Sequence, residues 1–310
     1  MFSVEFEFLK ALEQIRSGFL NTVFECVTML GEEAVAILIM AVLYFLYDKK
    51  PVYRIFFLTV TSLSVNHVIK NFVKLPRPFF SGKVSCVRPD TATGYSFPSG
   101  HTQSAFTVLG TPARWWSNTK LRVFCIVMIV LVGLSRMYLG VHTPADVGVA
   151  AIIGTILVFG MYPLFKNMDE NPKPVYILYV VFIIAAGAFV AYMELNTFPA
   201  DIDMANYESA LKHSWEIFFC AIGLLLVFHV DRTKLQFPTA APFKCQVIKV
   251  AIGAAVALGM KSGLKAPLLA LLNGNMMAHG IRYFVMILFA GIIWPMTFRW
   301  FEAGMPRKEK

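Results

Sequence analysis

Three short stretches of the chain combine cationic, imidazole and carboxylate side chains at fixed local spacing. They are Lys70-Asn71-Phe72-Val73-Lys74-Leu75-Pro76-Arg77-Pro78, Pro98-Ser99-Gly100-His101, and Ser135-Arg136 followed by His142 and Asp146. Arginine offers a planar fork and lysine a point charge to phosphate oxygens. Histidine can act as a nucleophile or a proton donor because its pKa lies near working pH. Together these side chains could bind a phosphate group and transfer it.

The stretch around Ser99 is typical of a helix start that faces an anion. We expect a helix to begin at Ser99, whose hydroxyl would join the backbone N–H groups of Gly100 and His101 at the helix N-terminus. Gly100 has no side chain to obstruct an approaching anion. In the third stretch, Asp146 follows His142 by four residues and could hold its imidazole in one tautomer. Two histidines and one carboxylate would then supply a nucleophile, a proton donor and an orienting group.

The composition predicts which elements position these residues. The chain has 310 residues, of which 57% are hydrophobic and 15% are charged, whereas a soluble domain is about 45–50% apolar and about 25% charged. The mean hydropathy is +0.62. So much apolar surface excludes a soluble enzyme, a disordered chain, a coiled coil and a secreted disulfide scaffold. The sequence therefore predicts an all-α fold, a polytopic bundle of membrane helices.

About nine stretches are apolar and long enough to cross a membrane. They are residues 28–47, 51–70, 99–116, 120–139, 143–165, 174–193, 212–230, 245–261 and 280–301. In this layout, all three motifs lie at helix ends on the same side of the membrane. That shared position predicts one pocket at the membrane surface that contains three cations, two histidines and one carboxylate.

The sequence predicts three parts of the chain. Residues 1–27 form an N-terminal amphipathic helix in the membrane surface, because apolar side chains recur at helical spacing between charged ones. These side chains are Phe8, Leu12, Ile15 and Phe19. Residues 28–170 form the catalytic membrane core, which carries the three motifs. Residues 171–310 add further transmembrane helices, whose sequence indicates no particular role.

The distribution of charge predicts the orientation. Lys and Arg concentrate in segments that lie inside when the N-terminus is placed outside, and cytoplasmic loops carry the excess of basic residues. The three motifs then lie on the extracytoplasmic side of a multi-pass cell membrane, or in the endoplasmic reticulum lumen of a eukaryote. The net charge of +9 does not indicate a nucleic-acid partner, because the basic residues stand between apolar runs rather than on one soluble face.

Each motif residue also has a purely structural interpretation. Lys70 could extend from a helix end to the membrane surface, and Ser99 could be an ordinary N-cap. The run 143–146 could be only a helix start, with a threonine cap and a proline in the first position. These interpretations explain the residues singly but not the presence of three complete motifs on one side of a membrane. We therefore favour the phosphate site.

The three motifs together resemble those of the type 2 phosphatidic acid phosphatase (PAP2) superfamily. That family carries Lys-x6-Arg-Pro, then Pro-Ser-Gly-His, then Ser-Arg-x5-His-x3-Asp, and every fixed position occurs here in order between residues 70 and 146. The resemblance covers residues 51–165 well and says less about the two ends of the chain. Soluble vanadium haloperoxidases share these motifs, but the membrane composition favours the membrane-bound lipid phosphatase branch.

The resemblance implies a role for each motif residue. His142 would attack phosphorus and form a phosphohistidine, Asp146 would orient His142, and His101 would protonate the leaving oxygen. The phosphoryl oxygens would be held by Lys70, Arg77, Ser99, Gly100 and Arg136. Related proteins use this site without a divalent metal, and the chain offers no carboxylate cluster for magnesium. We therefore expect neither a metal nor another cofactor.

A site at the outer membrane surface favours a substrate that is anchored in that leaflet, with its phosphate at headgroup level. We expect a phosphatase acting on lipid phosphate monoesters or diphosphates, such as undecaprenyl diphosphate or phosphatidic acid, with membrane lipids as its partners. Three alternatives stay open: phosphoryl transfer to another lipid, hydrolysis of a sugar phosphate as in glucose-6-phosphatase, and lipid binding or transport without catalysis. The sequence does not indicate an oligomeric state.

Overall fold

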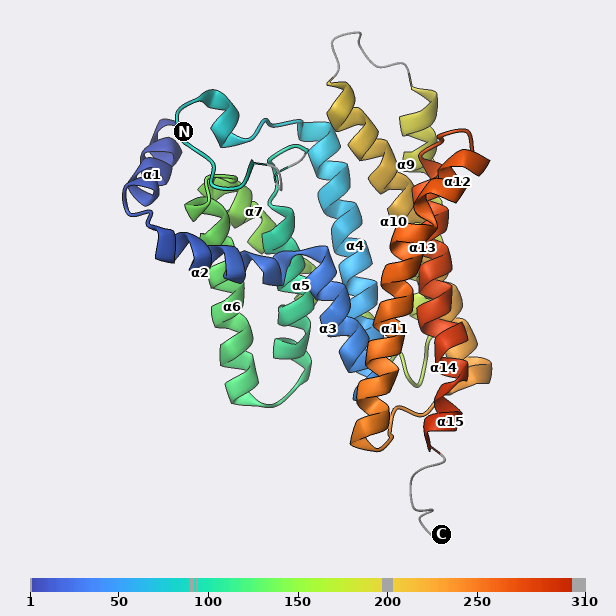
Figure 1. Ribbon diagram of the computed structural model, residues 1–310. Coiled ribbons are helices and arrows are strands. Elements are labelled where there is room, and N and C mark those ends of the chain that lie inside the picture. Colours follow the sequence, from blue (N-terminus) through green and yellow to red (C-terminus); the bar gives the residue numbers. More distant parts are fainter. Residues whose placement is uncertain (1, 90–91, 93, 197–202, 303–310) are drawn as a thin grey trace. The chain divides into compact units, whose positions relative to one another are not determined.

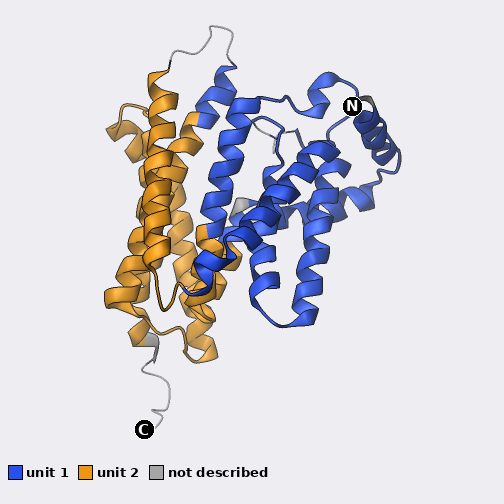
Figure 2. Ribbon diagram, turned by 180° about the vertical axis from the view of Figure 1, so that it is seen from behind, with its two compact units in different colours: residues 1–37, 58–167, 201–210 blue, residues 38–57, 168–200, 211–310 orange. Residues whose placement is uncertain are grey.

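The fold is known from a computed structural model that describes residues 2–89, 92, 94–196 and 203–302 (Figure 1). It is 81% helical, and none of the described residues forms a strand. The predicted all-α fold class is therefore confirmed. The chain divides into two compact units, which Figure 2 draws in different colours. Unit 1 comprises residues 1–37, 58–167 and 201–210, and unit 2 comprises residues 38–57, 168–200 and 211–310.

Unit 1 contains all three motifs. Its helices and helical turns are α1 (Phe2–Gln14), α2 (Gly18–Thr28), η1 (Met29–Gly31), η2 (Pro78–Ser81), α5 (Gly100–Trp115), α6 (Thr119–Tyr138), α7 (Pro144–Thr155), η4 (Ile156–Gly160) and α8 (Tyr162–Lys166). The second half of α4 (Lys49–Val73), from Leu58 on, also belongs to this unit. Helix α5 packs against α6 and α7, and α6 packs against α1 and α2. The core of unit 1 therefore surrounds α5 and α6.

Unit 2 contains most of the C-terminal half of the chain. Besides the end of α3 (Glu33–Leu46) and the start of α4, it holds α9 (Lys173–Leu195), most of α10 (Met204–Val230), η5 (Asp231–Leu235), α11 (Phe243–Gly263), α12 (Lys265–Leu271), α13 (Met277–Leu288), η6 (Phe289–Ile293), α14 (Trp294–Met296) and α15 (Phe298–Glu302). The buried carboxylate of Asp231 accepts hydrogen bonds from Lys49 Nζ at 2.7 Å and from the Tyr53 hydroxyl at 3.0 Å. This carboxylate therefore joins the start of α4 to the end of α10.

Six helical segments of the described chain are long and apolar enough to cross a membrane. They are Lys49–Ser81, Thr119–Tyr138, Lys173–Leu195, Met204–Leu235, Phe243–Leu271 and Met277–Trp300. A seventh is counted if the pair Gly18–Gly31 and Ala34–Leu46, bent by 56°, forms one span. The protein is therefore a multi-pass membrane protein, but the prediction of nine spans is not confirmed.

Two of the nine predicted stretches are too short to qualify as spans. Residues 99–116 correspond to α5, whose 16 residues reach about 24 Å at about 1.5 Å per residue, short of a hydrocarbon core of about 30 Å. Its buried side chains include several polar ones, among them Thr102, Gln103 and Thr107. Residues 143–165 contain only the shorter apolar helix Pro144–Gly160. Hydropathy suggested two spans here because it does not distinguish burial in protein from burial in lipid.

The predicted N-terminal amphipathic helix is divided into two helices. Helix α1 ends at Gln14 and α2 begins at Gly18, because the Ser17 side chain accepts a hydrogen bond from the Leu20 backbone N–H and caps α2. Phe8, Ile15 and Phe19 are exposed, as an interfacial helix requires, whereas Leu9 is fully buried. The assignment of 1–27, 28–170 and 171–310 as separate functional parts stays a prediction.

Polar contacts attach α1 to the loops that carry the motifs. Arg16 Nε donates to the Tyr138 carbonyl oxygen at 2.9 Å, and Arg16 Nη1 donates to the Ser85 hydroxyl at 2.8 Å. The Glu13 carboxylate accepts hydrogen bonds from both the backbone N–H and the hydroxyl of Ser85. These hydrogen bonds hold the pKa of Glu13 below its ordinary value. Helix α1 therefore supports the segment that follows the first motif and the end of α6.

A buried row of polar side chains joins α4 to α5 inside unit 1. Asn66 Nδ2 donates to the Gln103 side-chain oxygen at 3.0 Å and to the Pro98 carbonyl oxygen at 3.3 Å. Gln103 Nε2 donates in turn to the Ser62 carbonyl oxygen at 2.8 Å and to its hydroxyl at 3.0 Å. Polar contacts of this kind hold helices together where lipid supplies no hydrophobic driving force. They align the first motif, at the end of α4, with the second motif, at the start of α5.

The loop between α6 and α7, which carries His142, requires a glycine. Gly140 has a φ of +77°, where L side chains are strained, and a Cβ added there would overlap the Ser85 carbonyl oxygen. Gly148, inside α7, differs in both respects, because a Cβ added there would meet nothing within 4 Å. The two glycines therefore form a matched pair for testing this loop.

We expect Gly140→Ala to lower the free energy of unfolding by about 2 kcal/mol or more and to reduce activity, because it adds both strain and overlap. Gly148→Ala should leave stability unchanged or raise it slightly, as alanine favours helices. Thermal unfolding of the two purified variants in detergent measures the difference. Equal unfolding temperatures would contradict the role assigned to Gly140.

Candidate active site

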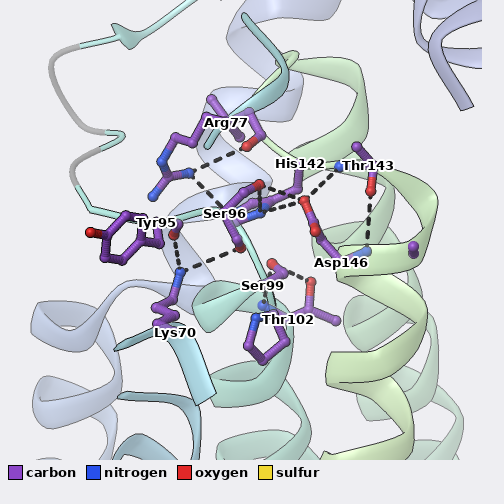
Figure 3. Close-up of polar contacts among 12 residues, drawn as sticks. Lys70, Arg77, Tyr95, Ser96, Ser99, Thr102, His142, Thr143 and Asp146 are labelled. Carbon is purple, nitrogen blue, oxygen red and sulfur yellow. Dashed lines mark hydrogen bonds and ion pairs between the residues drawn. The ribbon is translucent and has the colours of Figure 1, made fainter. Parts of the chain in front are cut away.

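All eight residues predicted to act on phosphate lie in unit 1, at helix ends or in adjoining loops. Figure 3 shows five of them, namely Lys70, Arg77, Ser99, His142 and Asp146. Lys70 lies in the last turn of α4, and Arg77 precedes η2. Ser99 is the N-cap of α5, so that Gly100 and His101 form its first turn. Arg136 lies in the last turn of α6, His142 in the following loop and Asp146 in the first turn of α7. Residues far apart in sequence thus meet where four helices begin or end.

The buried carboxylate of Asp146 binds three partners through one oxygen. Its Oδ2 lies 3.3 Å from His142 Nδ1, and it accepts hydrogen bonds from the Ser96 hydroxyl at 2.5 Å and the Thr143 backbone N–H at 2.8 Å. Ser96 Oγ also lies 3.3 Å from His142 Nδ1. Ser96, His142 and Asp146 are each at most 1% exposed. The imidazole is therefore held by two oxygens away from solvent.

The neighbours of His142 determine its tautomer. Arg77 Nη1 lies 3.3 Å from His142 Nε2, and a guanidinium can only donate, so Nε2 must carry the lone pair. The proton of a neutral imidazole then resides on Nδ1, which faces the oxygens of Asp146 and Ser96. This arrangement matches a nucleophile held by an orienting carboxylate. Nε2 is the atom that is free to react when a phosphate displaces the arginine contact.

The electrostatic surroundings keep His142 neutral. Burial lowers the pKa of His142 well below the ordinary value of 6.5, and the positive charges of Arg77, Lys70 and Arg136 lower this pKa further. A neutral imidazole retains its lone pair and can attack phosphorus, whereas an imidazolium cannot. The same cations that would bind a phosphate therefore also keep the adjacent imidazole in its reactive form.

Backbone carbonyl groups and one hydroxyl hold the three cations in place. Lys70 Nζ donates to the Tyr95 carbonyl oxygen at 2.5 Å, and Arg77 Nε donates to the Gly94 carbonyl oxygen at 3.1 Å. Arg136 Nη1 donates to the Thr28 hydroxyl at 2.7 Å. The buried Nε of Arg136 has no hydrogen-bond partner among the described residues. This N–H is therefore free to donate to an oxygen of a bound anion.

His101 lies among the same charged groups. It is close enough to Arg136, His142, Arg77 and Lys70 to interact with each of them electrostatically. Its backbone packs against Gly31, where an added Cβ would lie 2.8 Å from the His101 carbonyl oxygen. A second imidazole is thus present beside the first, as acid–base catalysis requires.

The structural interpretations of Ser99 and Asp146 also hold. Ser99 Oγ accepts hydrogen bonds from the Thr102 hydroxyl at 2.9 Å and the Thr102 backbone N–H at 3.4 Å, which makes it a true N-cap. Thr143 and Asp146 form a capping box at the start of α7, with Pro144 in the first helical turn. Because Asp146 Oδ2 both caps α7 and faces His142, the structural role and the chemical role of this residue are not alternatives.

The sequence did not predict three residues that support the site. Ser96 bridges His142 and Asp146, and Thr28 holds Arg136. Glu5 Oε1 accepts a hydrogen bond from the Ala145 backbone N–H at 3.1 Å, so that α1 contacts the first turn of α7 directly. Serine, threonine and glutamate are common residues with no motif around them, so no signal in a single sequence could have identified them.

Comparison with known proteins assigns the family. The sequence model of the PAP2 superfamily matches residues 50–170. Phosphatidylglycerophosphatase B of Bacillus subtilis (strain 168) is 32% identical over 177 residues, which are 53% of this chain and 82% of that protein. The chain belongs to the PAP2 superfamily. A second family model, that of the PAP2 superfamily phosphatase transmembrane extension, matches residues 218–306. Residues 50–170 and 218–306 of this PAP2 protein therefore each match a model of that superfamily.

Two further proteins are similar to about half of the chain. Undecaprenyl-diphosphatase BcrC of Bacillus subtilis (strain 168) is 26% identical over 175 residues, which are 55% of this chain and 87% of that protein. The crystal structure of LpxE from Aquifex aeolicus is similar with a TM-score of 0.45 and 26% identity, over 50% of this chain and 92% of that chain. The family models and the two Bacillus subtilis relatives show that the protein is a membrane phosphatase of the PAP2 superfamily, so the resemblance drawn from the three motifs is confirmed.

We expect the acid limb of the kcat/KM profile of this PAP2 phosphatase to lie below pH 6.5. The lowered pKa of His142 means that its neutral, reactive form persists to more acidic pH than that of an ordinary histidine. Steady-state assays from pH 4 to 9 measure the limb, with the ionisation of the substrate phosphate titrated separately. An acid limb above pH 7 that is not explained by the substrate would contradict the assignment.

We expect Ser96→Ala to reduce kcat about 10- to 100-fold with little change in KM, since Ser96 positions His142 without contacting phosphate. The variant should also shift the acid limb, because it removes a hydrogen-bond partner of both Asp146 and the imidazole. Thr111→Val is a matched control: Thr111 is also buried, lies outside the three motifs, and its hydroxyl donates to the Thr107 carbonyl oxygen of its own helix. A Ser96→Ala variant with wild-type kcat and pH profile would contradict the positioning role.

Proposed function

We propose that this protein hydrolyses the phosphate monoester or diphosphate group of a membrane lipid through a phosphohistidine on His142. The observation that supports this proposal best is the buried Asp146–His142 pair, whose Nε2 faces a cluster of three cations. A neutral nucleophile, an orienting carboxylate and a cationic phosphate pocket are the parts that phosphoryl transfer to a side chain requires. The same residues correspond to the motifs of the family.

The first step forms a bond between His142 Nε2 and phosphorus and breaks the bond from phosphorus to the leaving oxygen. His101, protonated when the negative charge of the bound phosphate offsets the neighbouring cations, gives this proton to that oxygen, which departs as the lipid alcohol or, from a diphosphate, as the lipid phosphate. The Nδ1 proton of His142 stays directed at Asp146 and Ser96, so the growing positive charge on the ring is stabilised by a carboxylate. Water has no access from that side, because all three residues are buried.

The second step reverses these roles. A water molecule attacks phosphorus, the bond to Nε2 breaks, and His101 accepts the proton that the water loses. Inorganic phosphate leaves, and His142 returns to its neutral form with the proton still on Nδ1. Throughout, Lys70, Arg77 and Arg136 balance the charge on the phosphoryl oxygens, and the α5 N-terminus at Ser99, Gly100 and His101 donates to them.

A lipid substrate fits the membrane setting of the site. The residues of the pocket lie at the ends of α4, α5, α6 and α7, and helix ends of a bundle lie at headgroup depth, where lipid phosphates also lie. The relatives are named for phosphatidylglycerophosphate and undecaprenyl diphosphate, and both substrates carry a phosphate on a membrane-anchored group. We further propose an extracytoplasmic active site. In the layout predicted from the sequence, fewer Lys and Arg lie on the side of the motifs than on the other side when Lys70, Arg77 and Arg136 are left out of the count.

We expect His142→Ala to lose phosphate release by at least about 10³-fold on every substrate, because no other group can form the covalent intermediate. Purified full-length protein is assayed in detergent with EDTA on undecaprenyl diphosphate, phosphatidic acid, a sphingoid-base phosphate and glucose 6-phosphate. Wild-type protein should release phosphate from the lipids in preference to the sugar phosphate. Acid-labile, base-stable labelling of His142 by a radioactive substrate would identify the intermediate.

His229→Ala serves as the matched control, because this histidine is exposed, belongs to unit 2 and to none of the three motifs, and its Nδ1 lies 3.0 Å from the Tyr176 hydroxyl oxygen. It should retain wild-type rates. Equal phosphate release by His142→Ala and wild type would contradict the nucleophile assignment. Preference for glucose 6-phosphate would contradict the lipid substrate, and phosphate passed to an added lipid acceptor instead of water would identify a transferase.

A further inference from the structure

A second group of basic side chains lies in unit 2, apart from the site described above. Four of them are close enough to His279 to interact with it electrostatically, namely Lys212, His213, Lys265 and Arg282. These five residues are called the α10–α13 cation cluster. Two come from α10, one begins α12, and two lie in the first two turns of α13. The cluster therefore joins three helices of the segment that matches the transmembrane extension or directly precedes it.

Close packing of α13 on α10 brings the cluster together. A Cβ added to Gly280 would lie 2.6 Å from the Trp215 carbonyl oxygen, so the two helix backbones approach as closely as glycine allows. Trp215 Nε1 also donates to the Glu194 carboxylate at 2.9 Å, which attaches α10 to the end of α9. Residues 279 and 282 lie next to this contact on α13, one on each side of Gly280. Residues 212 and 213 lie within one turn of Trp215 on α10. The geometry of the cluster is thus fixed by backbone packing.

The cluster combines two lysines and one arginine, and one of these three side chains pairs with a carboxylate. Lys212, Lys265 and Arg282 are permanent cations, and Glu216 lies 3.8 Å from Lys212. Arg282 is only 6% exposed and His279 only 8%. Of the three cations, Arg282 is the buried one, and a buried charge is unfavourable unless an anion or hydrogen bonds compensate it. The composition of the cluster therefore favours a negatively charged ligand.

The side chain of Arg282 has an unused hydrogen-bond donor. Its Nη1 donates to the Lys261 carbonyl oxygen at 3.3 Å, which fixes the direction of the guanidinium. Its Nε is buried and has no hydrogen-bond partner in the described part of the chain. A buried N–H without an acceptor is unfavourable, because it has lost its hydrogen bonds to water. A phosphate oxygen would satisfy it, because the guanidinium fork matches the spacing of phosphate oxygens.

The cluster is located at the ends of candidate membrane spans. Lys265 falls near the end of Phe243–Leu271, and Arg282 falls in the second turn of the span that begins at Met277. Span ends lie at headgroup depth, where basic side chains attract anionic lipids. The short helix α12, which ends the first of these spans, begins with Lys265 and ends with the exposed side chain of Leu271. Apolar surface for acyl chains is therefore adjacent to charge for a headgroup.

We propose that the α10–α13 cation cluster binds the phosphate group of an anionic phospholipid. The guanidinium of Arg282 donates to the phosphate oxygens, Lys212 and Lys265 add charge, and the bound headgroup holds α10, α12 and α13 together. The cluster carries no chemistry and does not depend on the His142 mechanism. Free inorganic phosphate offers the same oxygens without acyl chains, so the two sources of the phosphate group are tested separately.

The test measures the unfolding temperature of full-length protein in nanodiscs of phosphatidylcholine alone or with one fifth phosphatidylglycerol. Phosphatidylglycerol is a phosphodiester, so it carries the anionic phosphate without a terminal phosphate to hydrolyse. We expect it to raise the unfolding temperature of the wild type, and to do so less at high salt. Arg282→Gln should abolish the rise, and Lys265→Gln should weaken the apparent affinity for the lipid about tenfold.

Two further variants separate this site from the alternatives. Lys244→Gln removes an exposed lysine at the opposite end of α11 and should keep the full rise. Arg136 lies in the catalytic pocket, and Arg136→Gln should also keep the rise in unfolding temperature. That result would exclude lipid binding at the catalytic pocket as the cause of the rise. Should Arg282→Gln fail to fold, Lys265→Gln and Lys212→Gln decide the question, because Lys265 is exposed and Lys212 is only half-buried.

The outcomes are distinct. An equal rise in wild type, Lys244→Gln, Lys212→Gln and Lys265→Gln would overturn the proposal. A rise with inorganic phosphate at millimolar concentration in phosphatidylcholine, lost in the cluster variants, would support the phosphate site and assign it to a free anion. Loss of phosphate hydrolysis in His142→Ala with an unchanged lipid response would show that the two sites are independent.

Discussion

One carboxylate oxygen, Oδ2 of Asp146, connects the parts of this site. It caps α7 through the Thr143 backbone N–H, it accepts the hydroxyl proton of Ser96, and it faces Nδ1 of His142. A buried carboxylate is unfavourable unless such donors surround it, so the start of α7, the loop after Gly94 and the α6–α7 loop must meet at this point. The positions of the imidazole, and through it of Arg77, follow from that requirement.

The charge of the pocket also depends on buried groups that are held by hydrogen bonds. Three cations lie within electrostatic reach of one another in a largely buried environment, and only Asp146 among the motif residues is acidic. Their carbonyl and hydroxyl partners stabilise them without neutralising them. The pocket therefore keeps a net positive charge for an anion, while its low dielectric suppresses protonation of His142. The affinity for phosphate and the nucleophilicity of the imidazole that we propose would thus arise from one arrangement.

Buried polar contacts also hold helices together elsewhere in the fold. In unit 1, Asn66 and Gln103 join α4 to α5, and in unit 2 Asp231 joins the start of α4 to the end of α10. Hydrophobic burial gives little specificity between helices in lipid, because lipid tails are as apolar as the side chains. The backbone contact at Gly280 has a similar effect, since it assembles basic side chains from α10 and α13. In each case, small or polar residues fix helix positions.

The sequence alone determined the fold class, the family and the local geometry of the motifs. Composition excluded a soluble protein. His142 and Asp146 are four residues apart, so the sequence placed them together at the start of one helix, because geometry over a few residues depends on the chain itself. The number of spans was overestimated, because hydropathy treats the protein-buried α5 like a lipid-facing helix.

Only the tertiary structure identified the partners that complete the site. Ser96 is 46 residues from His142, Thr28 is 108 from Arg136, and Glu5 is 140 from Ala145. Contacts over such separations follow from how helices pack, which depends on the whole set of interhelical contacts. No local pattern of residues encodes them, and for that physical reason the support of the site became visible only in three dimensions.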